Sequence, residues 1–362
     1  MARHAIERLG HLVLVLWVVA SLTFAVFRLM PGDPTINFLS PTFSEDTRAA
    51  LLKSFGLDKP LWQQYLIYMS NLLHGDLGMS FLQGKPVTVL LAEALPNTVI
   101  LTIVALCAPY TIGIVGGAFL AFRRGGATEA AAIVTALATR AAPEFWLGML
   151  LLAGLAFQTG WFPTGGAMSP GQELGGLGGR LVSGDYWRHL ALPALTLMLY
   201  LQGLPLLLMR ATMLEVLNDE FITMARMKGL SRWSIVMRHA ARNALLPVVT
   251  AFALGLGASI GGNVVVETVF AWPGIGRLLV QAVQSADYPL AEGAFLLIAA
   301  SLVTMNTVAD LVYALLDPRV AVGARRWHPL RFALIRLFWQ PDDDDLCRSR
   351  HHFCGTLAES AQ

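Results

Sequence analysis

The sequence predicts an all-α membrane protein with six transmembrane helices and both termini on the cytoplasmic side. Only 14% of its 362 residues are charged, against about 25% in ordinary soluble domains, and 55% are hydrophobic. The apolar residues gather in runs that reach the length, about 20 residues, needed to cross the hydrocarbon core of a bilayer. The basic residues cluster in short segments beside these runs, as in proteins oriented by the positive-inside rule.

The first apolar run, Leu12 to Phe27, is predicted to be a retained membrane helix rather than a cleaved signal peptide. It is longer than the apolar region of a usual signal peptide, about 7–15 residues, and no A-x-A-like cleavage site follows it. We therefore expect the first crossing over residues 10–30. The other crossings are expected over residues 96–122, 130–157, 190–213, 244–268 and 292–316.

Lysine and arginine residues in the flanks of the spans orient the chain. With six crossings, one side receives both termini and two internal loops, and its basic residues are Arg3, Arg8, Arg123, Arg124, Arg226, Lys228, Arg232, Arg238, Arg242, Arg319, Arg325 and Arg326. The opposite loops hold fewer basic residues, and in the long first loop acidic residues outnumber them. The sequence therefore predicts cytoplasmic termini. The net charge of +2 gives no indication of nucleic-acid binding.

The long first loop, residues 31–95, is predicted to be an external helical segment. Ser44, followed by two acidic residues, is suited to start a short helix that Gly56 can end. Pro60 suits the first turn of a second helix, which the sequence GDLG from Gly75 breaks. We expect these helices to cap the outer mouth of the membrane domain. The alternative is that they lie on the membrane surface.

Several motifs that would indicate a different function class are absent from the sequence. There is no G-x-x-x-x-G-K-[ST] phosphate loop, so any ATPase that drives this protein is expected to be another polypeptide. HExxH is absent and no clustered His/Asp constellation lies in the apolar runs, so nothing supports a membrane enzyme. The Gly-rich stretch between Gly160 and Gly184 predicts a flexible outer loop.

The segment between the fourth and fifth spans, residues 214–243, is predicted to form a helix–turn–helix in the cytoplasm. Its apolar residues recur at intervals of three and four. Gly229 is placed to end the first helix in a left-handed conformation, with Leu230 making the usual hydrophobic contact, and Ser231 can cap the next helix. A basic loop that only contacts anionic lipid has no need of such a turn. We therefore favour a docking site for a separate protein over the lipid-contact alternative.

A series of motifs runs along residues 5–320. The first half contains FRLMPGDP from Phe27, FGLDKPLWQQY from Phe55, GDLGMSF from Gly75 and LPNTVILT from Leu95. The second half contains RATMLEVLNDEFITMARMKGL from Arg210, RHAARNALLPVVT from Arg238, GGNVVVETVFAWPGIGRLL from Gly261 and DPR from Asp317. In this order they resemble the permease subunits of ABC importers, in the dipeptide, oligopeptide and nickel branch.

This resemblance implies the ABC type I importer permease fold and a multi-pass subunit of the bacterial plasma (inner) membrane that transports rather than catalyses. The implied partners are a second permease in a heterodimer, two ATP-binding subunits and an extracytoplasmic substrate-binding protein. No cofactor is then bound by this chain, since ATP and Mg²⁺ belong to the ATPase subunits. Di- or oligopeptides are the implied cargo, with nickel complexes or oligosaccharides as alternatives. From another class, an ATP-independent secondary transporter is the alternative, against which the absence of a detectable inverted repeat argues.

In the family, the cytoplasmic "EAA" loop forms the coupling helix that binds the ATPase, and residues 220–229 correspond to it. The Glu-Ala-Ala triplet is here Thr223-Met224-Ala225. Pro247 follows the loop glycine at the longer spacing of the peptide branch. Small Ala225 is expected to let another backbone approach. The residues expected to contact the ATPase are Glu220, Phe221, Met224, Ala225, Arg226, Lys228 and Gly229.

Polar residues inside the apolar runs are further candidates, because polar groups in a membrane are costly and mark either a pathway or bonds between helices. They are Asn263, Glu267, Asn306, Asp310 and Arg140. Arg140 and Glu144, one turn apart, are expected to form an intrahelical pair, and Asp310 to pair with Arg319. For each candidate, the alternative to a pathway role is an interhelical bond or a contact with the second subunit.

These predictions divide the chain into four parts. Residues 1–30 are the N-terminal tail and first transmembrane helix, residues 31–95 the external helical segment, and residues 96–318 the permease core, with its coupling loop at 214–243. Residues 319–362 are predicted to be a disordered cytoplasmic tail. Its cysteine and histidine residues are too crowded for the usual spacing of a zinc site, so no metal site is expected.

Overall fold

The computed structural model describes residues 2–29, 59–172, 176–260 and 263–316. The regular elements among these residues are helices, and the only strand-like feature is an isolated bridge between Met79 and Pro86. The prediction of an all-α protein is thus confirmed. The chain divides into two units, residues 1–313 and 314–362, and the description that follows concerns the first. The helix expected from Ser44, and the tail at 319–362, lie outside the described residues.

Three helices among the described residues are long and apolar enough to cross a membrane. They are α4 (Val87–Phe122), the pair α8 (Gly184–Leu201) and α9 (Gly203–Val216) taken as one helix, and α15 (Tyr288–Leu316) as far as Val308. The expected first and fifth crossings fall on α1 (Ala2–Leu29), whose apolar part is shorter, and on α12 (Ala241–Ile260). A membrane protein with several spans is therefore confirmed, whereas the count of six stays a prediction.

The third expected crossing, residues 130–157, is not one straight helix. α5 (Ala127–Ala141) stops just before Pro143, and α6 (Glu144–Leu151), continued by the π-helical η2 (Leu152–Gln158), leaves at an angle of 106°. Proline has no N–H and forces the residue before it out of the helical region, so Ala142 is extended, with ψ 139°.

The same break separates Arg140 from Glu144, which lie on α5 and α6. The expected intrahelical pair between them was therefore wrong, because the two side chains no longer share one helix face. The guanidinium carbon of Arg140 instead lies 4.3 Å from the centre of the Tyr200 ring on α8. This cation–π contact connects α5 to α8.

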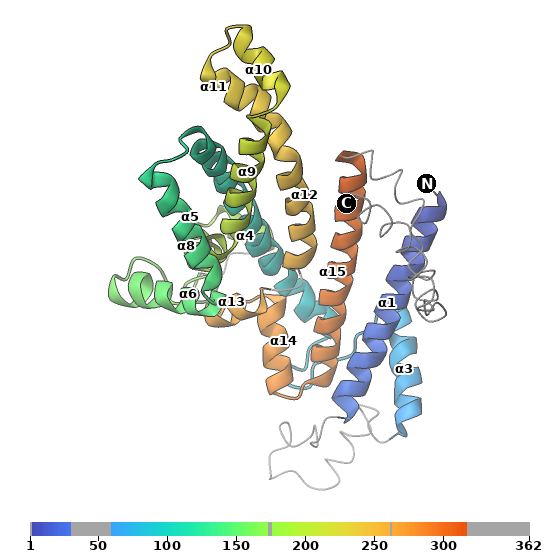
Figure 1. Ribbon diagram of the computed structural model, residues 1–362. Coiled ribbons are helices and arrows are strands. Elements are labelled where there is room, and N and C mark those ends of the chain that lie inside the picture. Colours follow the sequence, from blue (N-terminus) through green and yellow to red (C-terminus); the bar gives the residue numbers. More distant parts are fainter. Residues whose placement is uncertain (1, 30–58, 173–175, 261–262, 317–362) are drawn as a thin grey trace, which may run out of the picture. The chain divides into compact units, whose positions relative to one another are not determined.

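α3 (Leu61–Leu73) is the second helix that the sequence predicts in the external segment. It lies beside α1 (Figure 1), and the hydroxyl groups of Ser21 and Tyr65 are 2.8 Å apart. Pro60 precedes it with an extended ψ of 147°, as a helix start requires. The remaining helices are short: α7 (Gly176–Val182), α10 (Glu220–Met227), α11 (Arg232–Ser234), η3 (Ile235–Ala240), α13 (Val264–Val269) and α14 (Ile275–Gln284).

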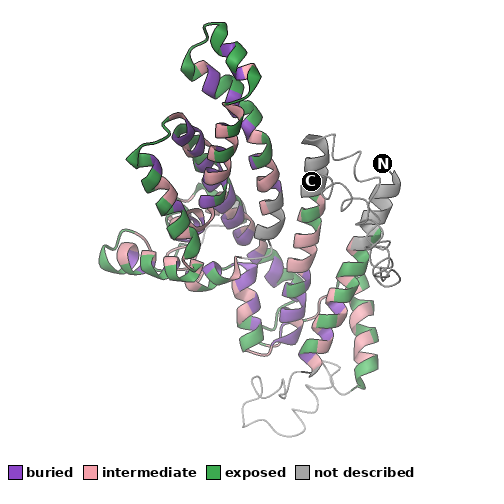
Figure 2. Cartoon of the chain, viewed as in Figure 1, coloured by how far each residue is buried: buried purple, intermediate pink, exposed green. Residues whose placement is uncertain are grey.

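One apolar cluster joins α4, α9 and α12 to the short helices α10 and η3. Met209, Met213, Ile222, Ala240 and Ala244 in this cluster are fully buried, at 0% exposure (Figure 2). Outside the lipid, removing apolar surface from water stabilises such a cluster by about 25 cal/mol for each Å². The base of the segment between the fourth and fifth spans is therefore part of the folded core.

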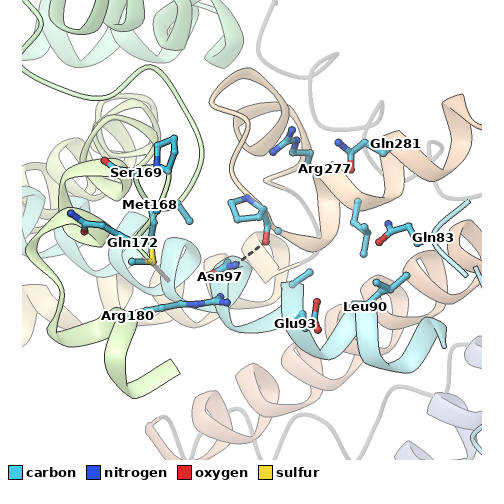
Figure 3. A pocket seen from close by; sticks show the side chains of 17 residues that line it. Gln83, Leu90, Glu93, Asn97, Met168, Ser169, Gln172, Arg180, Arg277 and Gln281 are labelled. Carbon is cyan, nitrogen blue, oxygen red and sulfur yellow. Dashed lines mark hydrogen bonds between the residues drawn. The ribbon is translucent and has the colours of Figure 1, made fainter. Parts of the chain in front are cut away.

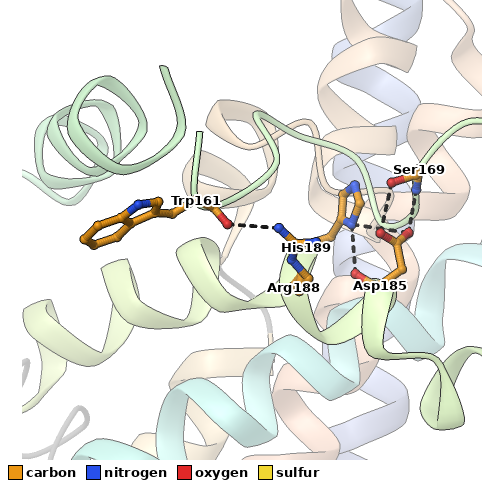
Figure 4. A network of polar contacts seen from close by, with 5 residues as sticks. All are labelled: Trp161, Ser169, Asp185, Arg188 and His189. Atoms are coloured by element: carbon orange, nitrogen blue, oxygen red, sulfur yellow. Dashed lines mark hydrogen bonds and ion pairs between the residues drawn. The ribbon is translucent and has the colours of Figure 1, made fainter. Parts of the chain in front are cut away.

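The segment expected to be a flexible outer loop is held in place where the structure describes it (Figure 4). The backbone N–H and the hydroxyl of Ser169 donate to the Asp185 carboxylate on α8, at 2.7 and 2.9 Å. Arg188 donates to the carbonyl oxygen of Trp161 at 3.1 Å, and His189 lies 3.6 Å from the Asp185 carboxylate. α8 thus supplies partners for polar groups of Trp161 and Ser169, whereas the flexibility expected of this loop stays a prediction.

A second carboxylate anchors the loop before α4. The buried side chain of Asp287 accepts hydrogen bonds from the hydroxyl of Ser80 at 2.5 Å and from the backbone N–H groups of Phe81 and Leu82 at 3.0 and 3.2 Å. The start of α15 is thereby tied to a loop about 200 residues earlier in the chain.

Candidate functional site

The turn between α10 and α11 has the local geometry that the sequence predicts. Gly229 adopts a φ of +75°, and its N–H donates to the carbonyl of Arg226 at 3.0 Å. The N–H of Leu230 reaches back to the carbonyl of Ala225 at 3.4 Å, which completes a Schellman motif. The hydroxyl of Ser231 accepts from the N–H of Ser234 and caps α11. The glycine-ended helix and the serine cap are both confirmed.

The two sides of α10 differ in exposure. Ile222 and Ala225 are buried, at 0% and 7% exposure, against the apolar cluster of the core. The close approach that we expected Ala225 to offer a partner is therefore made within this chain, and Phe221 also packs against that cluster. The opposite side and the following turn expose a group of large apolar side chains, which we call the docking face: Met224, Met227, Leu230, Trp233 and Met237.

The side chains of the docking face are largely exposed. Met227 and Trp233 are 76% and 60% exposed, and Met224 is 54% exposed. A contiguous exposed apolar surface rimmed by charges is typical of a protein–protein contact, and methionine adapts well to a partner's shape. The expected charged residues Glu220, Arg226 and Lys228 are all exposed around it. This arrangement can bind the groove of another protein.

We call residues 220–234, which form α10, the turn and α11, the docking hairpin. This hairpin contacts the end of α4. Arg232 donates to the carbonyl oxygen of Phe122 at 3.3 Å, and its guanidinium carbon lies 4.8 Å from the centre of the Phe122 ring. The ring of Trp233 meets the same phenylalanine edge-on, with 6.2 Å between ring centres. The turn after α10 is therefore in direct contact with the end of α4.

A partly buried ion pair connects the turn after α4 to α9. Arg210 of α9 pairs with Glu129 of α5 at 2.5 Å, and the other carboxylate oxygen of Glu129 accepts the N–H of Gly125. The turn between α4 and α5 is thus held against α9. Neither residue stands out in the sequence, because Glu129 and Arg210 are 81 residues apart and only the fold brings them together.

The polar residues predicted inside the apolar runs lie in different surroundings. Asn263 donates to the hydroxyl of Thr102 on α4 at 2.9 Å, which is an interhelical bond. Asn306 is exposed on α15, and Arg140 contacts Tyr200. Asp310 belongs to α15, but its side chain and the expected partner Arg319 lie outside the described residues. These residues are not gathered into one site.

Glu267 forms the most complete polar contact of this set. Its fully buried carboxylate accepts the hydroxyl of Thr98 at 2.7 Å and the N–H of Arg277 at 3.1 Å. It thereby caps the start of α14, where N–H groups have no partner within the helix. A Cβ on Gly274 would lie 2.3 Å from this carboxylate, so glycine is needed there. The sequence gives no sign of Thr98, which is 169 residues away.

Replacing Glu267 with alanine is expected to destabilise the folded chain by about 2–3 kcal/mol, because several buried donors lose their acceptor at once. The melting temperature of the purified protein in detergent, followed by tryptophan fluorescence, measures this loss. Thr268→Ala is the matched control, since the exposed Thr268 hydroxyl bonds only to the carbonyl of Val264 in its own helix. Equal melting temperatures for the two variants would show that the Glu267 cap contributes nothing.

Comparison with known families agrees with this architecture. Residues 113–322 match the family described as "Binding-protein-dependent transport system inner membrane component", and residues 1–102 match the corresponding N-terminal family. The first match covers more than half of the chain. The chain belongs to this family. It is therefore a membrane permease component of an ABC importer, a transport subunit of the bacterial inner membrane rather than an enzyme.

Individual relatives match the permease over most of its length. It is 35% identical over 321 residues to the oligopeptide transport system permease protein AppB of Bacillus subtilis, covering 88% of this chain and 99% of the relative. It is 34% identical over 335 residues to the dipeptide transport system permease protein DppB of Escherichia coli K12, with the same coverage. The glutathione transport system permease protein GsiC of Escherichia coli K12 is 33% identical over 320 residues, again covering 88% and 99%.

Proposed function

We propose that the permease carries di- or oligopeptides inward, forms the pathway with a second permease, and receives the work of ATP hydrolysis through its docking face. The exposure of the docking face is the observation that carries this proposal, because a lone transporter has no need of an apolar patch on a glycine-capped hairpin. The relatives AppB, DppB and GsiC are named for oligopeptide, dipeptide and glutathione transport, which favours short peptides over nickel complexes or oligosaccharides.

The proposed topology has six crossings with both termini in the cytoplasm. The docking hairpin then lies on the cytoplasmic side with the ATPases, and α3 and the remainder of residues 31–95 lie outside, where a substrate-binding protein delivers its ligand. ATP-driven closure of the ATPases would pull on Met224 and Met227. The contacts of Arg232 and Trp233 with Phe122 would pass this movement to α4. The permease would then have two states whose equilibrium is shifted by the ATPase on one side and by the substrate-binding protein on the other, which is the minimum that coupled transport requires.

Reconstitution tests the proposal. The permease is placed in proteoliposomes with its second permease and two ATPases. ATP is supplied in the lumen, and the binding protein with an equimolar mixture of synthetic di- and tripeptides outside. We expect peptide to accumulate in the lumen, as measured by mass spectrometry, only when every component and ATP are present. Uptake by the permease alone without ATP would contradict the proposal and support a secondary transporter.

A further inference from the structure

A pocket of about 870 Å³ (Figure 3) is lined by residues of the first turns of α4, at the opposite end of that helix from the docking hairpin. The first turns of α4, residues 167–172 and the segment from Pro273 to Gln281 form its walls. About 38 Å of helix separates Asn97 in the pocket from Phe122 at the hairpin, at 1.5 Å per residue. With the hairpin in the cytoplasm, this pocket therefore opens at the extracytoplasmic end of the permease.

The pocket carries charges of both signs. Figure 3 shows Arg180 and Glu93 on one side of the space and Arg277 on the other. Among the described residues, no ion pair or hydrogen bond occupies the side chain of Glu93 or of Arg180. The Arg277 guanidinium donates to the carbonyl oxygen of Ala271, which orients it and leaves further N–H groups for a ligand.

The other walls of the pocket are rigid and mixed in polarity. The amide of Asn97 is already used, since it donates to the carbonyl of Pro273 at 2.9 Å and accepts from the Tyr186 hydroxyl at 3.2 Å. Asp185 accepts from Ser169, and Glu267 caps the start of α14, so both walls are held by carboxylate contacts. Polar groups on rigid walls can orient a ligand at little entropic cost.

We propose that this pocket is an entrance site for a short peptide with free termini, whose C-terminal carboxylate binds Arg277 on one side and whose ammonium group binds Glu93 on the other. The volume lies within the range of about 300–1,000 Å³ that small-ligand pockets occupy. Arginine suits a carboxylate because its fork of N–H groups binds both oxygens. A peptide of two or three residues presents the two opposite charges that the pocket offers. The inference rests on the proposed function, since it assigns a subsite for the same cargo.

The complete importer in proteoliposomes, with the peptide mixture described above, tests the site. Arg277→Gln and Glu93→Gln are each expected to lower the initial rate of peptide uptake by about tenfold or more, as the loss of a charge-assisted contact predicts. Arg277→Lys should recover part of the rate because the positive charge is kept. Lys85→Gln is the matched control, since Lys85 is exposed, precedes α4 and lies outside the pocket. It should leave uptake within about twofold.

Three results separate the interpretations. Uptake by Arg277→Gln and Glu93→Gln at the wild-type rate would overturn the entrance site while leaving the proposed function intact. The affinity of the same complexes for the peptide-free binding protein is measured by surface plasmon resonance. If this affinity falls by the same factor as the uptake rate, the entrance site is also overturned, because the pocket would then be a surface that docks the binding protein. If the wild-type importer accumulates no peptide at all with ATP, it is the proposed function that fails. Unchanged melting temperatures establish that the variants are folded.

Discussion

Replacing Met224 and Met227 together with glutamate should abolish ATP-driven uptake while the permease stays folded in the membrane. The two side chains are 54% and 76% exposed, so the substitution removes little packing within the chain. In a complex with the ATPase, however, it would place two carboxylates in an apolar contact. Central contacts of this kind contribute about 2 kcal/mol or more each, so the affinity for the ATPase should fall by about a hundredfold or more.

Asn218→Glu is the matched control for this double variant. It adds a carboxylate at an exposed position just before α10 and outside the docking face. Co-purification of the ATPases with a tagged permease, together with peptide uptake, measures both variants. Full ATPase binding by the Met224→Glu/Met227→Glu variant would mean that the ATPase docks elsewhere.

Local features of the site could be predicted from the sequence because they depend on neighbouring residues. Gly229 and Ser231 define the turn between α10 and α11 through backbone bonds that span only a few positions. The break between α5 and α6 was equally local, since Pro143 marks it, but the apolar run on both sides suggested one long span. A proline inside an expected crossing thus carried more information than the hydrophobicity around it.

Contacts between distant parts of the chain could not be predicted in this way. Glu267 was recognised as a costly polar group, yet its partner Thr98 depends on how α13 meets α4. Asp287 was not recognised, because it lies next to a span rather than inside one. The inward orientation of Ala225 likewise follows from packing against η3, whereas the helical pattern alone leaves both faces of α10 open.

The close contact between α4 and α9 involves the glycines at positions 113 and 117 of α4, which are spaced as in the small-residue motif of membrane helices. Gly117→Ala is expected to destabilise the permease by about 3 kcal/mol, at the upper end of the overpacking range. A Cβ there would lie 2.5 Å from the carbonyl oxygen of Leu206 and 2.8 Å from Cβ of Met209. Because a backbone atom of α9 blocks the space, the two helices must move apart.

Substitution of the neighbouring residue, Gly116, is the control, and it is expected to change the stability in the opposite direction. A Cβ at Gly116 would lie 3.4 Å from a methyl group of Leu206, which is an ordinary contact. Gly116→Ala should therefore stabilise α4 by up to about 1 kcal/mol, because alanine favours a helix over glycine. Thermal unfolding of both variants in detergent measures the difference. If Gly117→Ala also raises the melting temperature, α4 and α9 do not cross at this distance. Arg210 and Glu129 would then lack the close helix packing that holds them together.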